Sequence, residues 1–87
     1  MSKVLQDVTQ EVIQYTQRLY YFPEDVKILK VEILTDDWNS RFLYTEYEMN
    51  GEKHNITEYY IYSLESAIIT VLEKIKDYYT KLRMLQM

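Results

Sequence analysis

The chain has 87 residues, a formal net charge of −4 and a hydrophobic content of 47%. This length favours one domain over residues 1–87 with a thin core, and the hydrophobic content argues against disorder. Cysteine is absent and glycine occurs once, which excludes a disulfide framework, a thiolate metal site and a glycine-rich phosphate loop. No apolar run reaches the ~18 residues of a membrane span, so we expect a cytoplasmic protein.

The N-terminal segment has the periodicity of an amphipathic helix over residues 2–20, with Ser2 as its N-cap. Apolar side chains recur there at spacings of three and four residues, namely Leu5, Val8, Val12, Tyr15 and Leu19. Pro23 predicts the end of this helix, because the residue before a proline disfavours helical backbone angles.

Three strands are expected next, over residues 26–35, 41–49 and 52–62, because these segments are rich in valine, isoleucine and tyrosine. The dipeptide Asn50-Gly51 is typical of a type I′ hairpin turn. A two-residue loop there would place Tyr47 opposite His54, whereas a three-residue loop with a glycine bulge would shift every pair by one. The sequence leaves the assignment of the two faces open.

A second helix is predicted from Ser63, its expected N-cap, to Leu85. Its apolar stripe consists of Leu64, Ile68, Val71, Ile75, Tyr78, Leu82 and Leu85. The resulting fold class is α+β, in the order α-β-β-β-α, with a three-stranded antiparallel meander packed against two helices. Two helices cover one face of so narrow a sheet, and the other face would stay open or contact a partner.

Acidic residues concentrate in the predicted sheet, because residues 22–65 contain ten acids and four bases. Tyrosine is favoured at interfaces for its large contact area and polar tip, and neighbouring carboxylates would steer a basic partner. We therefore expect a basic protein surface to bind the segment from the Asp36 loop to the hairpin. The candidate contact residues are Asp36, Asp37, Trp38, Tyr44, Glu46, Tyr47, Glu48, Glu52 and Glu58.

Catalysis is not expected. His54 is the only histidine and lies beside the predicted turn, and no serine has a base and an orienting group near it in the predicted fold. Asp36 and Asp37 supply too few oxygens for a hard cation. No catalytic residue, metal site or cofactor is therefore assigned.

Two further functions are considered. Tyrosines on an antiparallel sheet suit the stacking of single-stranded nucleic acid, but the predicted sheet is net negative where such binders are positive. The repeating stripe of the second helix could instead pair with a second copy, which would make a homodimeric assembly protein.

The expected element order, small size, acidity and lack of catalytic groups resemble small phage-encoded inhibitors, including some anti-CRISPR proteins. This resemblance extends over the whole chain and involves no shared motif, so it assigns no functional residue. It implies a protein that occupies the nucleic-acid-binding surface of a partner in the host cytoplasm. Salt sensitivity would separate such a charged complex from an apolar homodimer.

Overall fold

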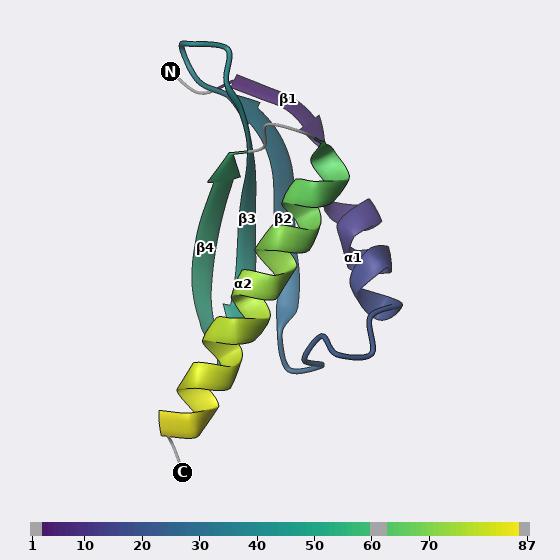
Figure 1. The fold of residues 1–87 in the computed structure, drawn as a ribbon, viewed down its shortest axis with the longest axis vertical. Helices are drawn as coiled ribbons and strands as arrows, with labels where there is room; N and C mark the ends of the chain where they lie inside the picture. Colours follow the sequence, from purple (N-terminus) through teal and green to yellow (C-terminus); the bar gives the residue numbers. More distant parts are fainter. Residues whose placement is uncertain (1–2, 60–62, 86–87) are drawn as a thin grey trace.

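The protein is described by a computed structural model over residues 3–59 and 63–85. It is an α+β fold in which a four-stranded antiparallel sheet packs against two helices (Figure 1). The elements in chain order are β1 (Lys3–Asp7), α1 (Thr9–Gln17), β2 (Lys27–Thr35), β3 (Arg41–Met49), β4 (Glu52–Tyr59) and α2 (Leu64–Leu85).

The hairpin of β3 and β4 has a turn at Asn50-Gly51 as expected, and its loop has two residues, which decides between the two loop lengths that the sequence left open. Asn50 and Gly51 both have positive φ angles, of 55° and 79°, as a type I′ turn requires. The register places Tyr47 opposite His54 and Phe42 opposite Tyr59 without interruption. Residues 60–62, the end of the predicted third strand, lie outside the described residues.

The prediction of one helix over residues 2–20 is wrong in its first part. Residues Lys3–Asp7 form β1, which pairs with the second half of β2, so the sheet has four strands where three were predicted. Helix α1 begins only at Thr9, whose backbone N–H donates to the Asp7 carboxylate at 2.9 Å. The Thr9 hydroxyl also accepts the Val31 N–H at 2.9 Å, which continues the edge bonding of β2 past the end of β1. The predicted Ser2 cap lies outside the described residues.

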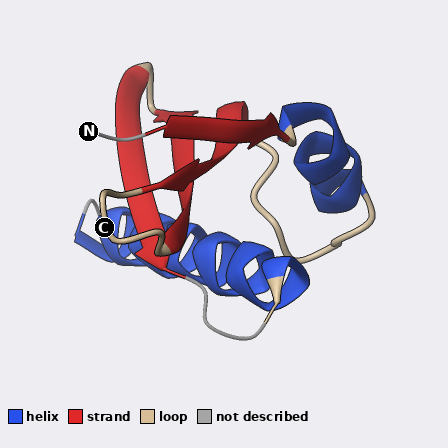
Figure 2. Cartoon of the chain, turned by 90° about the horizontal axis from the view of Figure 1, so that it is seen from above, coloured by secondary structure: helices blue, strands red, loops and turns tan. Residues whose placement is uncertain are grey.

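One core lies between the sheet and the two helices, which Figure 2 shows with α2 along one face of the sheet and α1 to its side. From the sheet it includes Val31 and Leu43, and from α1 it includes Val12, each with no more than 2% of its surface exposed. Four members of the predicted N-terminal stripe pack here, whereas Leu5 lies on β1 and is 46% exposed.

Helix α2 begins as predicted, because the Ser63 hydroxyl accepts the Ser66 N–H at 3.1 Å. Val71 and Ile75 of its predicted stripe are buried, and so are two residues outside that stripe, Ala67 and Leu72. Leu85, at the other end of the stripe, is 83% exposed. The last turns of α2 extend beyond the sheet in Figure 1, so the end of the stripe has no strand beneath it.

Candidate functional site

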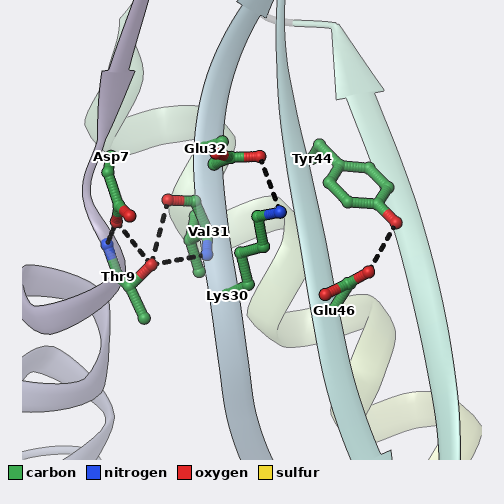
Figure 3. Close-up of polar contacts among 7 residues, drawn as sticks. All are labelled: Asp7, Thr9, Lys30, Val31, Glu32, Tyr44 and Glu46. Atoms are coloured by element: carbon green, nitrogen blue, oxygen red, sulfur yellow. Dashed lines mark hydrogen bonds and ion pairs between the residues drawn. The ribbon is translucent and has the colours of Figure 1, made fainter. Parts of the chain in front are cut away.

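The sheet has one covered face and one open face, and side chains alternate between them. Leu43 and Thr45 of β3 point to the helices and are 1% exposed, whereas Tyr44 and Glu46 point the other way. Figure 3 shows this open face, with α2 behind the strands and Lys30, Glu32, Tyr44 and Glu46 in front of them. We call it the open face below.

The centre of the open face carries a short polar network. Lys30 Nζ lies 3.4 Å from Glu32 Oε1, and the Tyr44 hydroxyl donates to Glu46 Oε1 at 3.0 Å (Figure 3). Bonding to Glu32 raises the pKa of Lys30, and the bond to Glu46 raises the pKa of the Tyr44 phenol. Both groups therefore hold their protons firmly, and neither is suited to act as a base at neutral pH.

Lysines on the neighbouring strands face the acids of β3. Glu46 is paired with Lys30 of β2, and Glu48 lies between Lys27 of β2 and Lys53 of β4 in the register. The carboxylates of Glu46 and Glu48 therefore lie next to positive charges on the neighbouring strands. The middle of the open face has both signs of charge, so its long-range field is weaker than the count along the chain implied.

One end of the open face is apolar across all four strands. The register places four side chains side by side there, which we call the end row: Val4, Leu34, Phe42 and Tyr59. The Phe42 and Tyr59 rings lie 5.2 Å apart between centroids, which leaves Phe42 8% exposed and Tyr59 56% exposed. Val4 is 51% exposed. Val4 and Tyr59 therefore keep about half of their surface in contact with water at this end of the sheet.

The loop between β2 and β3 joins the strands at the same end. The Asp36 carboxylate shapes it, because Oδ1 accepts the N–H groups of Trp38 at 2.9 Å and Ser40 at 3.0 Å. Asp36 Oδ2 also accepts the Tyr59 hydroxyl at 3.5 Å, which ties the loop to the end row. Within this loop the Trp38 side chain is 87% exposed and Asp37 is exposed.

The candidate contact residues from the sequence divide between the two sides of the sheet. Asp36, Asp37 and Trp38 lie in the loop, and Tyr44, Glu46 and Glu48 lie on the open face. The other three lie on the helix side and cannot join them, namely Tyr47, Glu52 and Glu58.

Each of those three has a local role. Tyr47 is 5% exposed, and its ring stacks on His54 with centroids 5.4 Å apart. Glu58 accepts a hydrogen bond from Lys74 Nζ of α2 at 2.6 Å, which ties the helix to the sheet. Glu52 lies beside the turn, with a carboxylate oxygen 4.0 Å from His54 Nε2.

The exposed members of the end row were not among the candidates from the sequence. Tyr59 could have been found, because the two-residue turn already placed it opposite Phe42. Val4 could not be found from the sequence, because its segment was predicted to be helical. Its place in the end row depends on the pairing of β1 with β2.

A groove of about 650 Å³ lies between the second half of α1 and the start of β2. Glu24 and Lys27 are the charged residues that line it, and most of the other lining residues are apolar. Over residues 3–59 and 63–85, no three histidine, aspartate or glutamate side chains are grouped so that they could hold a metal ion. Within these same residues, neither helix is both long and apolar enough to span a membrane.

Comparisons of the chain with protein-family models, with curated proteins and with solved structures found no match.

Proposed function

We propose that this protein is a non-catalytic binding module that contacts a partner protein through the end row and the Trp38 loop. The observation that carries the proposal is the exposure of Trp38, 87%, beside a row of apolar side chains that neither helix covers in the described part of the chain. Tryptophan and tyrosine are the residue types that most often anchor interfaces. The Asp36 carboxylate shapes the loop, so the indole is presented on an ordered backbone.

The partner surface that fits has an apolar centre and basic groups at its margin. Trp38 and Tyr59 would supply the central contacts, and the acids at positions 36 and 37 would face lysine or arginine. Lysines balance the acids in the middle of the open face, so apolar contact supplies most of the affinity and charge sets orientation. Raising the salt concentration should weaken such a complex only moderately.

A narrower form of the proposal is that the partner surface normally binds nucleic acid and that this protein blocks it, as a phage or mobile-element inhibitor would. The net charge of −4 favours it, because surfaces that bind nucleic acid are basic. Competition with a labelled oligonucleotide for the purified partner would test it. If the protein and the oligonucleotide bind the partner together, the blocking role is removed and the binding module remains.

The test compares partner capture by the parent protein and by two variants, Trp38→Ala and Val4→Lys. Tyr20→Ser is the matched control, because Tyr20 is an aromatic residue that is 99% exposed in another loop. We expect both variants to lose the partner while the control retains it. Exposed positions change stability by less than about 0.5 kcal/mol, so the melting temperatures should agree. Full retention of the partner by both variants would refute the proposed surface.

The electrostatic part is tested separately with Glu48→Lys and Asp37→Lys. Asp36 is not suitable for charge reversal, because its carboxylate holds the loop that presents Trp38. We expect slower association at low salt and a smaller change in the dissociation rate. Unchanged association rates would show that the partner is not basic.

A second candidate function is self-assembly through the end of α2. Met84 is 68% exposed and Leu85 is 83% exposed there, and both lie on the turns that extend beyond the sheet. Leu85→Lys would disrupt such a homodimer and leave partner capture by Trp38 intact.

A further inference from the structure

The two outer edges of the sheet differ in how well they are protected against pairing with another chain. The β1 edge is five residues long, and its register with β2 is interrupted between Val4 and Gln6. Short strands and irregular register are the usual protection of an exposed edge. The β4 edge has eight residues, no proline and an unbroken register with β3. Among the described residues, no strand pairs with its outer side.

The hairpin geometry fixes which backbone groups of β4 are directed outward. Beside a two-residue turn, the flanking pair Met49 and Glu52 exchanges hydrogen bonds, and the pattern then alternates along the strands. Residues 54, 56 and 58 therefore bond to β3. The N–H and C=O groups directed to the open edge belong to Lys53, Asn55, Thr57 and Tyr59.

We propose that two copies of this chain pair antiparallel through β4. The two-fold axis of the pair is perpendicular to the sheet and passes midway between the two copies of Ile56. In this register Asn55 lies opposite Thr57 of the second copy, and Lys53 lies opposite Tyr59. All four outward-directed residues then find partners, with about eight backbone hydrogen bonds across the axis. On the helix side, His54 lies opposite Glu58, so no like charges face each other.

The neighbouring register is less favourable on the same grounds. An axis midway between the two copies of Asn55 would bring Glu52 opposite Glu58 of the second copy. Two carboxylates that are directly opposite each other destabilise the pairing of strands. It would also leave the backbone groups of Tyr59 without a partner strand residue. The charge pattern and the hydrogen-bonding pattern of β4 thus both favour the axis at Ile56 over the axis at Asn55.

This axis keeps the open faces of both copies on one side and the helices on the other. The dimer would have one continuous sheet in the strand order β1-β2-β3-β4-β4-β3-β2-β1, with no free β4 edge. The inference does not depend on the proposed partner, because it rests on the outward backbone groups of β4. Tyr59 is the one residue that belongs to both surfaces, through its side chain in the end row and its backbone in the dimer.

The first test measures the molar mass in solution, by light scattering over a wide range of protein concentration, for the parent and three variants. Thr57→Pro removes only an outward N–H, so it should leave the β3–β4 ladder intact and give a monomer with an unchanged circular dichroism spectrum. Thr57→Val, the matched control, should remain a dimer. A monomeric parent at every concentration would overturn the proposal, and so would a Thr57→Pro variant as dimeric as the parent. Loss of the dimer in Leu85→Lys alone would place the interface on α2.

The second test fixes the register by crosslinking, which is direct because the chain contains no cysteine. Across the axis the two Ile56 Cα atoms would be about 4.5 Å apart, within the roughly 4.4–6.8 Å range of disulfides. Mild oxidation of Ile56→Cys should therefore give a covalent dimer. In the control His54→Cys, the two cysteines would be offset by about 13 Å along the strands and should not crosslink. The reverse result would overturn the register.

Discussion

Replacing Thr45 with valine should stabilise the protein. Thr45 lies at the centre of β3, is 1% exposed and faces Val31 and Ile56 across the sheet. Its hydroxyl oxygen is buried and has no hydrogen-bond partner within the described chain. A buried polar group without a partner costs about 1–3 kcal/mol, and Thr45→Val removes it while keeping the β-branched shape that suits a strand.

The gain should be visible in the thermal midpoint, because 1 kcal/mol shifts the midpoint of a domain of this size by about 4–8 °C. Thr57→Val is the matched control, since Thr57 is exposed on β4 and loses no buried group, and its stability should change by less than about 0.5 kcal/mol. Both variants are unfolded by heat and by urea at one protein concentration. If Thr45→Val unfolds at or below the midpoint of the parent, the Thr45 hydroxyl has a hydrogen-bond partner in solution. The expected stabilisation by valine would then be refuted.

Three further variants test the core, the turn and the start of α1. Ile75→Ala should lower the free energy of unfolding by about 2–5 kcal/mol, because Ile75 is fully buried; an unchanged urea midpoint would show that α2 does not pack as described. Gly51→Val should destabilise the folded protein by at least about 1–2 kcal/mol because of the positive φ angle, since no atom lies within 4 Å of the Cβ position to cause a clash. Gly51→Asn should have a smaller effect, and equal losses of stability in the two variants would reject backbone strain as the cause. Asp7→Asn should destabilise at neutral pH, because hydrogen bonds from Thr9 hold the pKa of Asp7 below 3.8 in the folded chain. That contribution is present above pH 3.8 and is lost as the pH falls through the lowered pKa, so the stability difference should shrink below pH 3.8, and a constant difference would contradict this origin.

The hairpin and the second helix could be predicted because their signals are local. Asn50-Gly51 specifies its own turn, and from that turn the register follows residue by residue. The spacing after Ser63 specified α2 over its whole described length. Local signals failed at β1, because Leu5 fits the helical spacing to Val8 and only pairing with β2 makes this segment a strand. Asp7 and Thr9, both typical residues at the start of a helix, were the local signs that the helix begins later.

The candidate surface was predicted less well, because charge was counted along the chain and not across it. The count over residues 22–65 included the lysines of β2 and β4, but it did not show that the register places them beside Glu46 and Glu48. The sequence left the two faces of the hairpin unassigned, so Tyr47 stood among the candidates although it is buried under α2. Trp38 lies in the loop between β2 and β3 and is exposed there.

The exposure of Trp38 has a spectroscopic consequence. It is the only tryptophan of the chain, and its indole meets water in the folded protein much as it would in the unfolded chain. Tryptophan emission should therefore change little when the domain unfolds, and melting is better followed by circular dichroism. The same indole would leave water when a partner covers the loop, and its emission would then move to shorter wavelength. One chain thus offers separate optical signals for folding and for binding, without an added label.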